Sequence, residues 1–406
     1  MKQGKRARDY LGEIESELTR RFGQKGAVRF FRAPGRVDWL GSHTDYNQGL
    51  ILASTVDREI IVGARLRNDK NLNLYSLNLE QEFRTGINNN VPDPKQVWAN
   101  YPRGVISELA QTGMEIPGMD LVFYGDIPIG ANLSSSAALE AATLEAILGL
   151  LDRPMTRWEK AFICWRAENF FVGMPCGILD QFTIINSEKD HLLFLDCDRL
   201  ASELIPINFK PEAKSKSASA EVRLLVIDSG IGRALVKSEY KKRVAECRQA
   251  YNALRKAGFK IKNLSRLKPG QLKAVEKKLV PTLFKRVRHI VTENERVLKG
   301  KESARKQNFS ELGKLFEQGY LSSSRDYENS ITELDLLHDL LAEFPGILGT
   351  RIAGAGWGGC LVALARKPDL EKLQACLTET YRKKTGHKFR IFPVQTGDAP
   401  GELEAR

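Results

Sequence analysis

The chain has 406 residues and a net charge of +12, and its 42% hydrophobic and 28% charged residues are ordinary for a globular protein. This length predicts two domains around a sizeable core. No apolar run approaches the ~20 residues of a membrane-spanning helix, the charged N-terminus lacks a secretory h-region, and the six scattered cysteines have no metal-ligand spacing, so we expect a cytoplasmic protein with reduced thiols and no membrane partner.

The positive charge is concentrated in one segment. Residues 231–310 contain 23 lysines and arginines against 6 acidic residues. A basic segment can bind nucleic acid, but this one lacks zinc-finger spacing, RNP aromatics and basic-zipper heptads. We therefore interpret it as a solvated helical surface that attracts small anions, and expect no nucleic-acid partner.

The first half of the chain alternates helical and strand-like patterns. An amphipathic helix is predicted at 9–22 and another at 98–112. Strand-like runs are predicted at 27–32, 50–55, 59–65, 72–76, 81–84 and 119–127. The segment 128–151 begins as a loop and becomes an alanine-rich helix. A helix at 156–171, a loop at 173–181 and a strand at 191–198 follow.

The second half begins after a polar, serine-rich stretch at 209–223, which predicts a loop near a domain boundary. A strand near 223–230 leads to a helix at 236–257, where Tyr240, Val244, Cys247, Tyr251 and Leu254 form one apolar stripe. Basic helices continue to about 343. The chain closes with strands at 349–353, 360–365 and 388–394 and a helix at 368–384. Mixed elements without regular βαβ alternation favour an α+β fold.

The segment 128-PIGANLSSSAALE-140 places glycine and serines between a strand and a helix start. Free N–H groups at a helix N-terminus favour an anion, above all a phosphate, and a serine there can cap the helix. Ser136 offers a hydroxyl to a Mg²⁺ ion on a nucleotide. The alternative is an ordinary helix cap with serines in a turn.

The segment 354-GAGWGGC-360 matches G-x-G-x-x-G, but a strand-like run follows it where a dinucleotide fingerprint requires a helix. Glycines between two strands instead allow positive φ and close approach to a ligand or another loop. A simple tight hairpin is the alternative.

Two further segments carry polar groups among apolar neighbours. In 35-GRVDWLGSHTDYNQG-49, His43 and Asp45 have the donor and acceptor chemistry to bind sugar hydroxyls. In 175-PCGILDQF-182, Asp180 is either a paired structural carboxylate or a functional base. The Walker A pattern, the protein-kinase signatures and the G-x-S-x-G elbow are absent.

Together these segments resemble the GHMP-type small-molecule kinases, and within them the galactokinases. The resemblance rests on 32-RAPGRVDWLGSHTDYNQG-49, 128-PIGANLSSSAALE-140 and 354-GAGWGGC-360, with further matches at 98–105, 167–182, 194–198, 238–247, 288–297 and 326–335. The matches occur in family order over roughly residues 28–365. The resemblance implies a two-lobed fold, with an N-terminal lobe at 1–210, a C-terminal lobe at 211–406 and the active site in the cleft.

The same resemblance implies phosphate transfer from ATP to the anomeric C1 hydroxyl of a sugar, with ATP and a sugar as the partners of a chain that we expect to be a monomer. Asp180 would be the base and Arg36 would stabilise the transferring phosphoryl group. The sugar would contact Ser42, His43, Thr44, Asp45, Gly177 and Tyr240. The nucleotide would contact Gly130, Ala131, Asn132, Leu133, Ser134, Ser135, Ser136 and Trp98. Mg²⁺ would be held by Ser136 and Glu168.

Structural explanations compete for several of these residues. Tyr240 lies on the apolar stripe, His43 could be a satisfied structural histidine, Glu168 a helix-surface residue and Trp98 a buried aromatic. The resemblance favours the functional interpretation for Arg36, Asp180, Glu168 and Ser136, and leaves Trp98 undecided.

The chain departs from the family pattern G-R-V-N-[LI]-I-G-E-H-x-D-Y at Asp38, at Trp39–Leu40 and at Ser42, where the family has Glu. The segment 128-PIGANLSSSAALE-140 resembles the phosphate loop of the superfamily. Asn132 replaces a usual glycine of this loop, and asparagine tolerates the left-handed backbone. In the family, the acid at position 42 would accept a hydrogen bond from the sugar hydroxyl toward C6. Serine is shorter and neutral, so Ser42 leaves the identity of the sugar undecided. The hypotheses are a galactose kinase, a C1-kinase for L-arabinose, galacturonate or N-acetylgalactosamine, and, ranked last, a non-catalytic sugar sensor.

Overall fold

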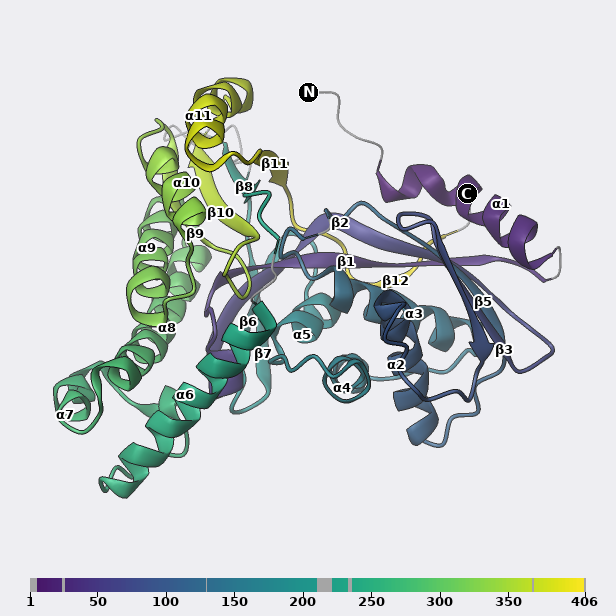
Figure 1. Ribbon diagram of the computed structural model, residues 1–406, viewed down its shortest axis with the longest axis horizontal. Coiled ribbons are helices and arrows are strands. Elements are labelled where there is room, and N and C mark those ends of the chain that lie inside the picture. The colour runs from purple at the N-terminus through teal and green to yellow at the C-terminus, as the bar shows by residue number, and fades with distance from the viewer. Residues whose placement is uncertain are drawn as a thin grey trace.

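The computed structural model describes residues 6–23, 26–128, 130–209, 221–232, 236–366 and 369–404 (Figure 1). Its largest element is an eight-stranded sheet in the order β12-β1-β2-β5-β3-β4, with β6 paired to β2 and β7 paired to β6. The strands are β1 Arg29–Leu40, β2 Leu50–Leu66, β3 Asn71–Ser76, β4 Gln81–Gly86, β5 Met119–Gly125, β6 His191–Asp196, β7 Ala201–Pro206 and β12 Gly401–Glu402. Every pairing is antiparallel except the β3–β5 pair.

The two central strands are longer than the sequence predicts. Strand β1 continues past residue 32, where the sequence predicts its end. Its pairing with β2 shifts register between Pro34 and Arg36, and this shift accommodates Pro34 and Gly35 without ending the strand. The predicted strands 50–55 and 59–65 form one strand of 17 residues. Asp57 interrupts the apolar pattern there, but its N–H donates to the Gln395 carbonyl and the backbone stays extended. Arg36 therefore lies on a strand. The sequence also missed β7 and β12.

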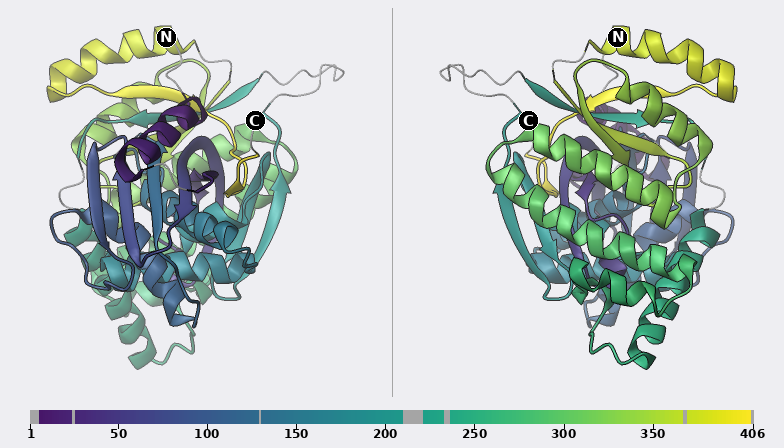
Figure 2. Two further views of the ribbon diagram at one scale, coloured as in Figure 1. Left: turned by 90° about the vertical axis from the view of Figure 1, so that its right-hand side faces the viewer. Right: turned by 90° about the vertical axis from the view of Figure 1, so that its left-hand side faces the viewer.

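Helices cover both faces of this sheet (Figures 1 and 2). Helix α1 (Leu11–Phe22) packs on one face, and α2 (Val97–Gln111), α3 (Ser135–Leu150), α4 (Arg157–Arg166) and α5 (Leu179–Asn186) lie on the other. Alternation along β2 explains both layers: Ile61 is buried with α1, whereas Val62 is buried in the main core with α3. The predicted helix 156–171 ends as α4 at Arg166 and continues as a π-helical segment, Ala167–Val172.

The second half contains a four-stranded antiparallel sheet in the order β11-β8-β10-β9. Its strands are β8 Val222–Asp228, β9 Ile347–Ile352, β10 Cys360–Arg366 and β11 Arg390–Val394. The helices are α6 Val236–Lys256, α7 Leu272–Glu276, α8 Pro281–Arg305, α9 Phe309–Ser322, α10 Thr332–Ala342 and α11 Leu370–Thr385, with a π-helical segment at Ser323–Tyr327. Short 3₁₀ turns lie at Ala7–Tyr10, Asp45–Asn47, Leu264–Arg266 and Pro269–Gln271. The predicted α+β class is confirmed.

The two halves share apolar and polar contacts. The main core contains residues of both sheets and of α8 and α9, and the C-terminal strand β12 returns to pair with β1. The predicted lobe boundary at 210/211 and most of the predicted loop 209–223 lie outside the described residues. The apolar stripe on α6 packs against α8 through Cys247 and Leu254, but Tyr240 at its start lines a cavity.

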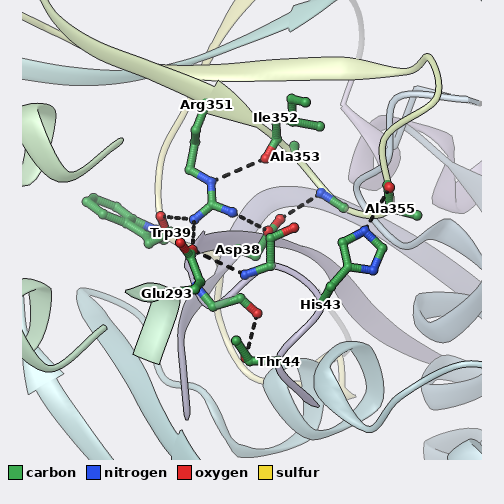
Figure 3. A network of polar contacts seen from close by, with 12 residues as sticks. Asp38, Trp39, His43, Thr44, Glu293, Arg351, Ile352, Ala353 and Ala355 are labelled. Atoms are coloured by element: carbon green, nitrogen blue, oxygen red, sulfur yellow. Dashed lines mark hydrogen bonds and ion pairs between the residues drawn. The ribbon is translucent and has the colours of Figure 1, made fainter. Parts of the chain in front are cut away.

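A buried ionic network joins the end of β1 to α8 and β9 (Figure 3). Arg351 donates to Asp38 Oδ2 at 3.2 Å and lies 3.5 Å from Glu293 Oε1. Asp38 Oδ1 accepts from the Gly354 N–H at 2.8 Å, and Glu293 accepts from the Gly41 N–H at 2.8 Å. Burial by itself raises the pKa of Glu293, but the cations Arg296 and Arg351 hold it at about 2. Asp38, a departure from the family pattern, is therefore fully paired.

Replacing Arg351 with methionine should lower the free energy of unfolding by about 3–5 kcal/mol, because it leaves two buried carboxylates short of a cation. Asp38→Asn should cost less, since an amide oxygen still accepts from Gly354. Urea titration measures both. Arg305→Met, which removes an exposed ion pair, is the matched control and should change stability far less. Equal losses for the two arginine variants would contradict this account.

Candidate active site

A cavity of about 320 Å³ lies where the predicted segments converge. It is bounded by the end of β1, the phosphate loop, the π-helical segment, the loop before α5, the start of α6 and the glycine-rich turn after β9. The side chains and backbone that line it come from Arg36, Asp38, Ser42, His43, Asp45, Tyr101, Pro128, Gly130, Ala131, Asn132, Leu133, Ser134, Ser135, Ser136, Glu168, Met174, Pro175, Cys176, Gly177, Leu179, Asp180, Tyr240, Gly354 and Ala355.

Asp180 and Arg36 form an ion pair at this cavity. The sequence places Asp180 in a loop, but it belongs to the first turn of α5. Its Oδ1 accepts from Arg36 Nε at 2.8 Å and lies 2.6 Å from Nη2. Its Oδ2 accepts from the Ser134 hydroxyl, and Arg36 Nη1 donates to the Asn132 carbonyl at 2.7 Å. Both carboxylate oxygens are therefore fixed, one by a cation and the other by a hydroxyl.

The phosphate loop reaches its shape through left-handed residues. Gly130 has φ 86°, Asn132 φ 54° and Ser134 φ 56°, so Asn132 does adopt the backbone expected of it. Ser134 is the N-cap of α3, but its hydroxyl binds Asp180 instead of capping the helix. The first N–H groups of α3 are thus left for an anion beside Ser135 and Ser136, which line the cavity.

The glycine-rich turn packs against that loop, as expected for glycines that allow a close approach. Asn132 Nδ2 donates to the Ala353 carbonyl at 3.0 Å. A Cβ added to Gly359, at φ 77°, would stand 2.2 Å from the same Nδ2 atom. Only a glycine at position 359 allows the turn to approach Asn132 so closely. The contact joins the 354–360 turn, from the second half of the chain, to the phosphate loop, from the first half.

Glu168 and Ser136 form the oxygen-rich part of the cavity. Glu168 is 6% exposed, and burial, together with the charge of Asp180, raises its pKa to about 7. The Ser136 hydroxyl hydrogen-bonds to it, and no cation pairs with it within the described ranges. Those residues hold no cluster of three or more His, Cys, Asp or Glu side chains suited to a metal. One uncompensated carboxylate and a hydroxyl nevertheless fit Mg²⁺ on a nucleotide, where phosphates supply other ligands.

Asp45, Gly177 and Tyr240 meet at another part of the cavity wall. A Cβ on Gly177 would stand 1.5 Å from Asp45 Oδ2, so only glycine fits there. Asp45 accepts from the Leu179 N–H at 3.4 Å. Burial and the nearby Asp180 raise its pKa to about 6. Asp45 is therefore a hydrogen-bond acceptor whose negative charge lowers the stability of the protein when no ligand is bound.

His43 and Thr44 have protein partners for their polar atoms. The His43 Nε2 atom lies 2.9 Å from the Ala355 carbonyl and Nδ1 lies 3.0 Å from the Tyr46 hydroxyl. Burial lowers the pKa of His43 to about 3, so the ring is neutral and donates to Ala355. Thr44 is fully buried and donates to the Gly41 and Leu50 carbonyls. His43 thus lines the cavity with its ring, whereas Thr44 shapes the turn.

Ser42 differs from these neighbours. It is 2% exposed and lines the cavity, yet its hydroxyl has no partner among the described residues. Its carbonyl accepts from His289 Nε2 at 3.0 Å, which holds the backbone in place. A buried unpartnered hydroxyl at a cavity wall is a candidate ligand contact.

Trp98 does not line the cavity. It lies on α2 and packs edge-on against Phe123. Tyr101, three residues further along the same helix, reaches the cavity instead. Residues three apart share a helix face, so the position of Trp98 on a helix also indicates Tyr101 as a candidate. The resemblance to the family implies Trp98 alone.

Comparison with known proteins identifies the family. Residues 100–188 match the model of the GHMP kinases N-terminal domain, residues 301–383 match GHMP kinases C terminal, and residues 16–66 match the galactokinase galactose-binding signature. The fold and these matches define a GHMP kinase. A mevalonate kinase from Methanococcus jannaschii shares the fold, with a TM-score of 0.64 at 16% identity over 92% of this chain and 100% of that one.

Closer relatives narrow the class. A galactokinase from Halalkalibacterium halodurans is 34% identical over 92% of this chain and 93% of its own length, and one from Chloroflexus aurantiacus is 36% identical over 91% and 92%. A crystal structure of Lactococcus lactis galactokinase complexed with galactose superposes with a TM-score of 0.90 at 30% identity, covering 97% of this chain and all of that one. The chain belongs to the galactokinase family and is a sugar kinase. Within the described ranges, no helix is both long and apolar enough to cross a membrane.

Asp45→Asn should raise the stability of the ligand-free protein relative to wild type as the pH rises from 4 to 7. The folded-state pKa of Asp45 is raised, so its stabilising contribution is present below about pH 4 and is lost by about pH 6. The relative gain should reach up to about 3 kcal/mol in urea unfolding. Asp69→Asn is the control: Arg67 lowers the pKa of Asp69, so the stabilising contribution of Asp69 is already complete above about pH 4 and the difference from wild type should stay constant from pH 4 to 7. A pH-independent difference for Asp45→Asn would refute the penalty.

Proposed function

We propose that this sugar kinase transfers the γ-phosphate of ATP to the C1 hydroxyl of galactose or a closely related neutral sugar. One observation carries the proposal: Asp180, held at both oxygens by Arg36 and Ser134, faces a cavity between an anion-binding helix start and the Ser42–Asp45 turn. We assign residues 1–210 and 211–406 to two lobes that flank this cleft.

In this proposal, Asp180 accepts the proton of the C1 hydroxyl as the oxygen attacks the γ-phosphorus, the bond from that phosphorus to the bridging oxygen breaks, and ADP leaves. Arg36 pairs with Asp180 and stabilises charge on the transferring group. The loop 130–136 binds the phosphates through its backbone N–H groups. Mg²⁺ held by Ser136 and Glu168 would neutralise charge on the nucleotide phosphates. The intact contact between Arg36 and Asp180 supports an enzyme over a silent sugar sensor.

The charges at the sugar end favour a neutral substrate. Arg36 is the one cation among the described residues that line the cavity, and it already pairs with Asp180. A sugar carboxylate near Ser42 would instead meet Asp45 and a neutral His43, which argues against galacturonate. The unpartnered Ser42 hydroxyl supports L-arabinose as a second candidate substrate. A neutral serine binds a C6 hydroxyl less strongly than an acid would, so a sugar without that hydroxyl loses less affinity at this site.

Asp180→Asn should lower kcat by about 10²–10⁴-fold, because the amide cannot take the C1 proton. The Kd for ATP should stay close to the wild-type value, since the phosphate loop is unchanged. An ADP-release assay and calorimetric titration measure the two quantities, with the remote Asp69→Asn as the control. A wild-type kcat for Asp180→Asn would disprove the base assignment.

Ser42→Glu should increase the preference for galactose over L-arabinose, measured as the ratio of kcat/KM. A hydrogen bond from the C6 hydroxyl to a charged acceptor contributes about 1.5–3 kcal/mol, roughly 10- to 150-fold. Ser42→Ala controls for loss of the hydroxyl, and galacturonate should be a poor substrate for all three proteins. An unchanged ratio in Ser42→Glu would mean that position 42 does not select the sugar.

A further inference from the structure

A buried glutamine lies behind the oxygen-rich part of the cavity. Gln181 is fully buried, and its Nε2 donates to Glu168 Oε2 at 2.6 Å and to Glu140 Oε2 at 3.1 Å. An amide NH₂ has two hydrogens, so one side chain can serve both acceptors. Gln181 thus bridges Glu168, which faces the cavity, to Glu140, which does not line it.

The fold brings these residues together from three elements. Ser136 and Glu140 are four residues apart on α3, so both side chains lie on one face of the helix. Gln181 follows Asp180 on α5, and Glu168 belongs to the π-helical segment. A π-helical turn is rare and often marks a functional site. Each of these elements also supplies a residue of the proposed reaction centre.

Stability alone does not account for this arrangement. Glu140 is fully buried, and burial, with the charge of Glu168 adding to it, raises the pKa of Glu140 well above its ordinary value. The Oε1 atoms of Glu140 and Gln181 are both buried without a partner among the described residues. Unpaired buried polar atoms destabilise the folded state, and apolar residues of similar size would avoid this cost. A functional role is the remaining reason for the bridge.

The bridge also restricts Glu168. Its Oε2 accepts from Gln181 and has the Cys176 thiol 3.6 Å away. Together with the Ser136 hydroxyl, which also hydrogen-bonds to Glu168, these donors hold the carboxylate in one orientation. Partners of this kind, one shell behind a ligand, orient metal-binding side chains.

We propose that Gln181, anchored by Glu140, is a positioning residue that orients the Glu168 carboxylate and thereby sets the affinity of the site for a divalent cation on the nucleotide. This inference rests on the proposed function, in which Glu168 is a metal ligand. It assigns Gln181 no contact with substrate or with the reacting atoms.

The test is the coupling between Mg²⁺ and ADP binding, measured by calorimetry as the Kd for ADP with and without Mg²⁺. Gln181→Met removes the donor at nearly the same size, and should weaken Mg²⁺ binding to the ADP complex by about 10- to 100-fold while leaving the metal-free Kd unchanged. Gln181→Asn, which is too short to span both acids, should do the same and serves if the methionine variant does not fold. Electron paramagnetic resonance of Mn²⁺ with ADP gives an independent readout.

Two variants separate positioning from general packing. Thr183 lies on the same helix as Gln181 and is equally buried, and its hydroxyl has no partner among the described residues. Thr183→Val removes that hydroxyl and should keep wild-type Mg²⁺ coupling. Glu140→Gln keeps an acceptor for Gln181 and should keep most of the coupling, whereas Glu140→Leu should lose it as Gln181→Met does.

The outcomes distinguish the inference from the function on which it rests. If Glu168→Ala abolishes the Mg²⁺ coupling but Gln181→Met and Gln181→Asn retain it, the positioning role is wrong and the proposed metal site stands. If the coupling is also unchanged in Glu168→Ala, the metal assignment itself is wrong, and the positioning role falls with it.

Discussion

The contact between Arg36 and Asp180 is the interaction on which the rest of this site depends. It joins strand β1 to helix α5, and through Asn132 and Ser134 it also fixes the loop before α3. A single guanidinium therefore sets the distance between the carboxylate and the helix start proposed to bind phosphate. The bulged pairing of β1 with β2 makes this possible, because it carries Arg36 past Pro34 while keeping the strand continuous.

Around this contact the protein gathers acidic side chains. Asp45, Glu140 and Glu168 all have raised pKa values, mainly because burial disfavours their charged forms. Such a site lowers the stability of the empty protein, and a bound cation and sugar hydroxyls would offset part of that cost. The Arg351 network differs, because its carboxylates have cations, and Arg296 and Arg351 hold the pKa of Glu293 at about 2. The first cluster fits a ligand site, and the second holds the two halves together.

The departures from the family pattern are of different kinds. Asp38 and Asn132 replace residues of the usual pattern, and both contact the glycine-rich hairpin from the opposite half of the chain: Asp38 accepts from Gly354, and Asn132 donates to Ala353. They are accommodated by partners in the same structure. Ser42 has no such partner for its hydroxyl, so it is the departure that leaves the choice of sugar to experiment.

The sequence by itself determined the α+β class, most helices and strands, and the membership of the family, because periodicity and ordered motifs are local properties of the chain. It also indicated that the segments of Arg36, Ser136, Glu168 and Asp180 belong to one site. Tertiary structure decided which atoms are available there. The polar atoms of His43 and Thr44 bond to protein partners, Tyr101 lines the cavity whereas Trp98 does not, and Gln181 bridges two buried acids. Thr44 bonds within its own turn, but Ala355 lies 312 positions from His43, and Glu140 lies 41 positions from Gln181. No local pattern in the sequence specifies contacts between separate segments of this kind.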